Sequence, residues 1–151
     1  MGLGAIPGAP AAVGATKEFF VPVTYATAMT AFGDYPVANC DSSGKHAYIA
    51  FKVPHDFTSI ITAKIIIIPI DTNPAVRYDI SSNYGAEGEA YNTHSESQTA
   101  PTYNVTANRF FAIDISGILS SLAADDYVGV DFFRSLVTGN AYVLGVRFKY
   151  D

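Results

Sequence analysis

The segment 142–150, YVLGVRFKY, restricts the fold more than any other, because its large side chains recur at every second position. Successive side chains of a β-strand point to opposite faces, so this period predicts a strand with one apolar face. The apolar face is expected to carry Tyr142, Leu144, Val146, Phe148 and Tyr150. Arg147 and Lys149 are expected on the opposite face. A chain built on such strands must bury their apolar faces against a second layer.

Six further segments are predicted as strands: 18–25, 45–53, 59–70, 76–84, 109–115 and 126–133. The expected inward residues are Ala47, Ile49, Phe51 and Val53 in one strand and Val128, Val130 and Phe132 in another. Turn residues at 33–36, 71–75 and 138–141 separate the strands, and Pro22 indicates a sheet edge. Segment 59–70 is too apolar for simple alternation. We expect it to be a central strand covered on both faces, by another sheet or by another subunit.

Segment 116–126, SGILSSLAADD, is the one predicted helix. Ser116 is a suitable cap, and Ile118, Leu119 and Leu122 form an apolar stripe. An α/β fold would need several longer helices between the strands. About eight strands with one short helix therefore predict an all-β chain, an antiparallel β-sandwich of the jelly-roll kind.

Residues 1–16, MGLGAIPGAPAAVGAT, are predicted to form an extended N-terminal arm, and residues 17–151 the jelly-roll domain. The arm contains four Gly, five Ala and two Pro, and it shows no amphipathic period. In a free monomer such a segment would be a disordered tail, whereas in an assembly it would suit a groove on a neighbouring subunit. The residues expected to contact a partner are Leu3, Ile6, Pro7, Pro10, Val13, Ile66 and Ile68.

Charged residues make up only 15% of the chain, and the net charge is −5. Binding to nucleic acid or to an anionic membrane requires a basic patch, so neither partner is expected. The longest apolar run, IIIIPI, is far shorter than the ~20 residues of a membrane span. The first charged residue is Lys17, so the basic start of a signal peptide is missing. The single cysteine, Cys40, excludes an internal disulfide.

The stretch 84–97, YGAEGEAYNTHSES, places Glu87, Glu89, His94 and Glu96 within ten residues. Carboxylates and an imidazole could bind a metal ion or transfer protons. On one strand, however, Glu87 and Glu89 would share one face and His94 and Glu96 the other. We therefore favour a structural or interface loop over a metal site, and we expect no catalytic residue and no cofactor. His46 and His55 have no ligand-spaced partners, and both are expected to be surface or interface hydrogen bonders.

The segments FFVPVTY, GDYPVA, AYIAFKVPHDFTSI, YGAEGEAYNTHSES, IDISGILSSLAADDYVGV and VLGVRFKY resemble a group of small jelly-roll proteins from tailed-phage and environmental viral sequences. The resemblance covers roughly residues 18–150 and excludes the arm. It implies a non-enzymatic structural protein of the virion, a capsid decoration or cement protein on the capsid surface. It further implies a homotrimer that clamps its neighbours with the N-terminal arms and binds the major capsid protein or another virion subunit. It carries over no catalytic motif.

Two alternatives remain open. In the first, the chain is a subunit of an extracellular or viral filament, and its arm adds as a strand to the next subunit. A donor strand should be β-branched and alternating, so the Gly/Ala/Pro-rich arm disfavours this hypothesis. In the second, the chain is a carbohydrate-binding jelly-roll module in which exposed Tyr48, Tyr84 and Tyr91 stack on sugars. The absence of Trp disfavours this second hypothesis.

Overall fold

The computed structural model describes residues 15–98, 102–134 and 139–151. The elements of the described residues are β1 (Lys17–Pro22), β2 (Tyr25–Ala26), β3 (Met29–Phe32), β4 (Tyr35–Cys40), β5 (Lys45–Lys52), β6 (Ile60–Pro69), β7 (Asn73–Val76), β8 (Asp79–Gly85), β9 (His94–Gln98), β10 (Tyr103–Val105), β11 (Phe111–Asp114), the 3-10 turn η1 (Ser116–Ile118), β12 (Tyr127–Arg134) and β13 (Ala141–Tyr150). Within these residues, no helix is long and apolar enough to span a membrane.

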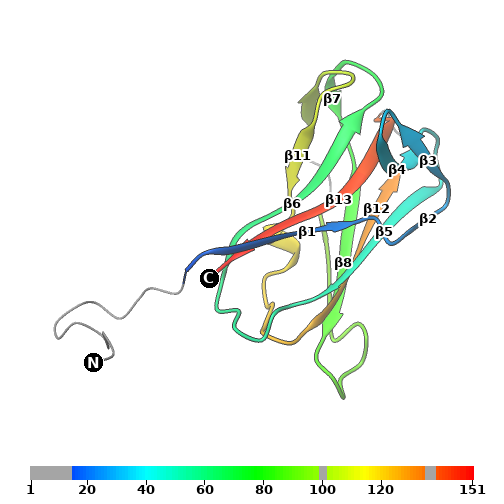
Figure 1. Cartoon of the computed structure of the whole chain (residues 1–151). Helices are drawn as coiled ribbons and strands as arrows, with labels where there is room; N and C mark the ends of the chain where they lie inside the picture. Colours follow the sequence, from blue (N-terminus) through cyan, green and yellow to red (C-terminus); the bar gives the residue numbers. More distant parts are fainter. Residues whose placement is uncertain (1–14, 99–101, 135–138) are drawn as a thin grey trace, which may run out of the picture.

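The strands form two main antiparallel sheets (Figure 1). Sheet A has the order β11-β6-β13-β4-β3, with β1 also paired to β13, and sheet B has the order β2-β5-β12-β8-β9. A small ribbon pairs β7 with β10. Apart from β1, β2 and β3, four strands of sheet A (β4-β13-β6-β11) face four strands of sheet B (β5-β12-β8-β9), and the chain crosses repeatedly from one sheet to the other. This arrangement is an eight-stranded jelly roll, which confirms the predicted all-β sandwich.

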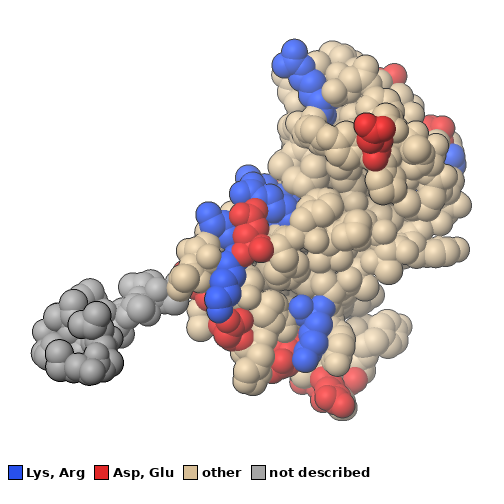
Figure 2. Space-filling view, in the orientation of Figure 1, with Lys and Arg blue, Asp and Glu red and all other residues tan. Residues whose placement is uncertain are grey.

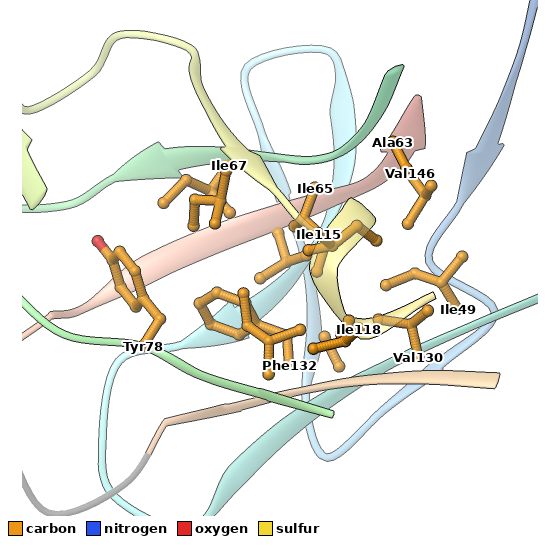
Figure 3. Close-up of a cluster of buried hydrophobic side chains, with 14 of the residues drawn as sticks. Ile49, Ala63, Ile65, Ile67, Tyr78, Ile115, Ile118, Val130, Phe132 and Val146 are labelled. Atoms are coloured by element: carbon orange, nitrogen blue, oxygen red, sulfur yellow. The ribbon is translucent and has the colours of Figure 1, made fainter. Parts of the chain in front are cut away.

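The core lies between the two sheets (Figure 3). Sheet A contributes Ile65, Ile67 and Val146, and sheet B contributes Ile49 and Phe132, all of them fully buried. Full burial of side chains of this size contributes about 1.5–3 kcal/mol each, so the interlayer contact is the main source of stability. The predicted inward residues of 45–53 and 126–133 are confirmed, with Phe51 at the partly buried margin of the core.

A β-bulge in β13 corrects the predicted alternation of 142–150. Val143 pairs with Ile67 and Gly145 pairs with Ile66, so Leu144 is an extra residue in β13. The parity of the strand therefore changes at Leu144. Ala141 and Val143 face the core before the bulge, and Val146, Phe148 and Tyr150 face it afterwards. Tyr142 and Leu144 were assigned to the wrong face, since both are half-buried outside the core.

Gly145 is required at this bulge because strand β1 approaches its backbone very closely. A Cβ atom at position 145 would lie 2.1 Å from the carbonyl oxygen of Val21 and 2.8 Å from the Cα atom of Pro22. Both are backbone atoms, which cannot rotate away. Pro22 itself ends β1, which among the described strands pairs only with β13, in agreement with the edge position predicted for this residue.

The predicted helix at 116–126 is wrong. Only Ser116–Ile118 form a 3-10 turn, and Ser116 makes no capping hydrogen bond. The backbone groups are taken by side chains from sheet B: the Ser82 hydroxyl donates to the carbonyl of Ile118, and the amide of Ser121 donates to the Tyr84 hydroxyl. Such side-chain bonds compete with helical hydrogen bonding. The apolar stripe is nevertheless buried against the core, as expected from its pattern.

Strand β6 is central in sheet A, as predicted, since it pairs with β11 on one side and β13 on the other. Ile68 is 3% exposed within the chain itself, and Ile66 is half-buried. In register, Ile68 lies beside Tyr142, whose ring stacks on Phe32 of β3 at 4.8 Å. Ile68 is therefore covered within its own chain. Whether Ile66 and Ile68 contact a partner stays a prediction.

Other predicted elements are shifted. Segment 76–84 is divided into β7 and β8, and β7 takes up part of the turn expected at 71–75. The N-terminal arm falls almost wholly on residues 1–14, which lie outside the described residues. The predicted contacts of Leu3, Ile6, Pro7, Pro10 and Val13 are therefore untested.

Candidate binding face on sheet B

The outer face of sheet B has a flat centre made of small and polar side chains. In the register of the sheet, Gly129 of β12 lies between Ala50 of β5 and Asn83 of β8. All three are exposed, and they face outward because their neighbours Val128 and Val130 point into the core. The centre of this face therefore has almost no side-chain bulk, since glycine and alanine leave the backbone bare.

Three adjoining hollows lie along this face, with volumes of about 520, 330 and 290 Å³. The first two share Ala50, Asn83 and Gly129, and the last two share Ser81 and Asp131. Together they form one continuous depression along β5, β12 and β8, which we call the trough. At 3.3 Å per residue, the span from Tyr127 to Phe133 of β12 corresponds to about 20 Å.

One side of the trough carries a row of rings from β2, β5 and β12. Tyr25 lies 6.0 Å from Tyr48, Tyr48 lies 5.4 Å from His46, and His46 lies 4.3 Å from Phe133, measured between ring centroids. His46 Nδ1 lies 2.8 and 3.0 Å from the two carboxylate oxygens of Asp131. This pair fixes the imidazole between its two ring neighbours.

The other end of the trough is bounded by the loop 86–93, which follows β8. Tyr91 on this loop is 80% exposed, and Tyr127, which lines the same hollow, is 54% exposed. Lys52 lies over the Tyr127 ring, 5.8 Å from its centroid, and also pairs with Asp125 at 3.3 Å. Two large aromatic side chains are thus available to a ligand at this end.

The four residues considered for a metal site do not converge. Within the described residues, no group of three or more His, Cys, Asp or Glu side chains could hold a metal ion. Glu87 and Glu89 line the trough, and Glu89 Oε2 accepts a hydrogen bond from the amide of Ala86 at 2.9 Å, which closes the loop turn. His94 stacks on Tyr84 with centroids 4.8 Å apart.

Glu96 has a structural role. Its carboxylate accepts hydrogen bonds from the Tyr84 hydroxyl at 2.6 Å and from the amide of Ser120 at 3.1 Å, and also from the Ser120 hydroxyl. Burial opposes the charged carboxylate, but these hydrogen bonds outweigh it and lower the pKa of Glu96. Glu96 therefore ties β9 to the turn after η1.

The predicted hydrogen bonding of His46 and His55 is confirmed, since His55 Nδ1 lies 2.7 Å from Asp125 Oδ2. Of the three tyrosines proposed to stack on sugars, Tyr48 and Tyr91 line the trough, at 38% and 80% exposure. Tyr84 is 0% exposed, so its assignment as a surface tyrosine was wrong. Tyr84 is four residues after Ile80 on β8, so the alternation of the strand predicts that both side chains point toward the core. Tyr127 was missed.

Comparison with known proteins gives no match to a family model and no match among curated proteins. Among solved structures, the chain is similar to the CBM36-1 domain of a multidomain xylanase from the hindgut metagenome of Trinervitermes trinervoides, with a TM-score of 0.43 and 10% identity over 87% of this chain and 96% of that one. It is also similar to CBM86, a low-affinity xylan binding module from Roseburia intestinalis, with a TM-score of 0.42 and 15% identity over 91% and 97% of the two chains. At TM-scores below 0.5, such a likeness carries no information about a shared site.

Proposed function

We propose that this chain is a non-catalytic glycan-binding module that holds a sugar chain in the trough of sheet B. The observation that carries the proposal is the combination of a bare floor with exposed aromatic rings. Ala50 and Gly129 allow a ligand to approach the sheet backbone, while Tyr91 and Tyr127 offer rings at one end. Aromatic rings with one apolar face and one polar edge suit sugars, which have apolar faces and hydroxyl edges.

Polar groups along the floor supply the hydrogen bonds that a sugar requires. Asn83 offers both a donor and an acceptor, Ser81 offers a hydroxyl, and Asp131 offers an acceptor. Binding sites generally combine apolar walls with a few such placed polar groups. The jelly roll itself is used by lectin domains and by viral capsid proteins alike, so the fold alone does not decide between these functions.

The proposal is tested by filling the trough. A Cβ atom at position 129 would fit without a clash, because its only neighbour within 4 Å is the Asn83 carbonyl oxygen at 3.9 Å. Gly129→Leu should therefore fold normally and obstruct the floor. Ala112→Leu is the matched control, since Ala112 is exposed on the outer face of sheet A.

Both variants and the unmodified chain are to be run by affinity electrophoresis through gels containing neutral, amino-sugar and uronate polysaccharides. We expect at least one polysaccharide to retard the unmodified chain and Ala112→Leu, but not Gly129→Leu. Equal retardation of all three proteins would contradict binding in the trough. Absence of retardation by every polysaccharide would contradict the glycan-binding function.

A second proposal, the capsid decoration protein, is favoured by a different surface. Large apolar side chains lie exposed on strands of sheet A and on the loop before β11, with Phe20 at 49%, Met29 at 51%, Tyr35 at 46% and Phe110 at 59% exposure. Exposed apolar area of this kind is typical of protein interfaces. Light scattering of the full chain and of a chain lacking residues 1–16 tests it. A closed oligomer supports assembly on a capsid, arm-dependent open polymers support a filament, and a monomer in both cases contradicts both.

A further inference from the structure

We infer that the trough selects a glycan with several free, protonated amino groups, in preference to a neutral or a uronate glycan. This inference rests on the proposed glycan-binding function and narrows its ligand class. The charges that line the trough, their hydrogen-bond partners and their positions along it support the inference.

Apart from the imidazole of His46, which pairs with Asp131, the ionisable groups that give the lining its charge are carboxylates. The carboxylates of the three hollows are Asp79, Glu87, Glu89 and Asp131, whereas none of the described lining residues is Lys or Arg. In Figure 2, acidic atoms gather at the lower end of the molecule, where Figure 1 places the loop after β8. A ligand in the trough therefore meets a negative potential, which would repel a carboxylated or sulfated glycan.

Most of these carboxylates are free to accept from a ligand. Within the described residues, the carboxylates of Asp79 and Glu87 make no hydrogen bond or ion pair with another protein group, and Glu89 uses only Oε2, on the amide of Ala86. Only Asp131 is paired, with His46 at 2.8 Å. The lining thus offers unsatisfied acceptors, as a cationic ligand requires.

The lysine at the rim does not neutralise the trough. Lys52 stands at the rim beside Tyr127, and its ammonium group pairs with Asp125, which lies outside the lining. Other basic side chains are paired elsewhere on the surface, among them Arg147 with Glu18 and Lys17 with Asp56. The chain as a whole carries a net charge of −5, which adds to the attraction of cations.

The positions of the carboxylates indicate an oligomer and not a single sugar. Glu87 and Glu89 lie at the loop end of the trough and Asp79 lies at the other end, while Asp131 lies between Asp79 and the uncharged floor around Asn83. Only a ligand with amino groups repeated along its length can contact both ends across the trough, which is about 20 Å long.

The test compares a glucosamine oligomer with the fully N-acetylated oligomer of the same length by titration calorimetry, at a pH where the amines are protonated. Because exposed charge pairs contribute little individually, we expect the free amine oligomer to bind about three- to tenfold more tightly in low salt. This preference should disappear in about 1 M salt, where charges are screened beyond ~3 Å. A galacturonate oligomer of equal length should bind more weakly than either.

The variant Asp79→Asn combined with Glu87→Gln removes two of the four lining carboxylates and should bring the affinity for the amine oligomer closer to that for the acetylated one. Asp34→Asn is the control, since Asp34 is exposed in the β3–β4 turn, away from the trough. If the two oligomers bind equally well to the unmodified chain, the inference is overturned while glycan binding stands. If neither oligomer binds and no polysaccharide binds, the proposed glycan-binding function is contradicted as well.

Discussion

Replacement of Gly145 by alanine should destabilise the protein strongly, because the backbone of β1 leaves no room for a Cβ atom at this position. The added methyl group would lie 2.1 Å from the Val21 carbonyl oxygen, 2.8 Å from Pro22 Cα and 2.9 Å from Phe20 Cζ. The Phe20 ring can rotate, but the two backbone contacts can be relieved only if β1 moves away from β13.

The size of the effect follows from these contacts. Overpacking by one carbon usually costs about 1–3 kcal/mol, and a contact with backbone atoms belongs at the upper end of that range. Displacement of β1 would also weaken its pairing with β13, which extends from Lys17 opposite Tyr150 to Pro22 opposite Gly145. We therefore expect Gly145→Ala to lower the free energy of unfolding by about 2–3 kcal/mol.

Urea unfolding followed by far-UV circular dichroism gives this free energy by linear extrapolation. Gly117→Ala is the matched control, because a Cβ atom at position 117 meets nothing within 4 Å. The control should change stability by no more than about 1 kcal/mol, and it can stabilise the chain by restricting the unfolded state. If Gly145→Ala unfolds at the same urea concentration as Gly117→Ala, the close approach of β1 and the bulge geometry are refuted.

Two other predictions concern titration and reactivity. Burial opposes the charged form of Glu96, but the hydrogen bonds to its carboxylate lower its pKa below the ordinary value of 4.5. The charged carboxylate therefore stabilises the folded state. This stabilisation is complete above the unfolded-state pKa and is lost as the pH falls through the folded-state pKa. Glu96→Gln should therefore be less stable than the unmodified chain near neutral pH. If the difference in melting temperature between the two proteins does not become smaller below about pH 4.5, this stabilising role of the Glu96 carboxylate is contradicted. Burial raises the pKa of the Cys40 thiol to about 12, so a thiol reagent should label the native protein far more slowly than the urea-unfolded protein; equal labelling rates would show that Cys40 is accessible.

The strand pattern could be predicted from the sequence wherever one face is buried and the pairing is regular. Alternation placed Ile49, Val130 and Phe132 correctly because each strand has one face against the core. The same rule failed at Leu144, since an inserted residue reverses the parity of everything before it. Only the glycine at position 145 marks the bulge in the sequence, and glycine within a strand also occurs at tight bends and where a ligand approaches the backbone.

The absence of a helix at 116–126 and the presence of the trough could not be predicted from the sequence, for two different reasons. Segment 116–126 has the apolar stripe of a helix, but some of its backbone groups form hydrogen bonds with side chains of a distant strand, Ser82 and Tyr84, in place of the hydrogen bonds of a helix. The trough depends on sheet register, because Gly129 becomes part of a bare floor only when Ala50 and Asn83 lie on either side of it. No pattern within a single segment of the sequence predicts which residues of β5 and β8 will lie beside Gly129.

The pairing of β1 with β13 brings the two ends of the sandwich together. Lys17 lies opposite Tyr150, and the Thr16 hydroxyl donates to the Asp151 carboxylate at 3.2 Å. A short peptide could join these two positions, so the domain should tolerate circular permutation with new termini in an exposed turn such as Gly33–Asp34. Because both ends leave from sheet A, a permuted or tandem-fused domain would keep the outer face of sheet B unobstructed, which makes it suited to display on a solid support.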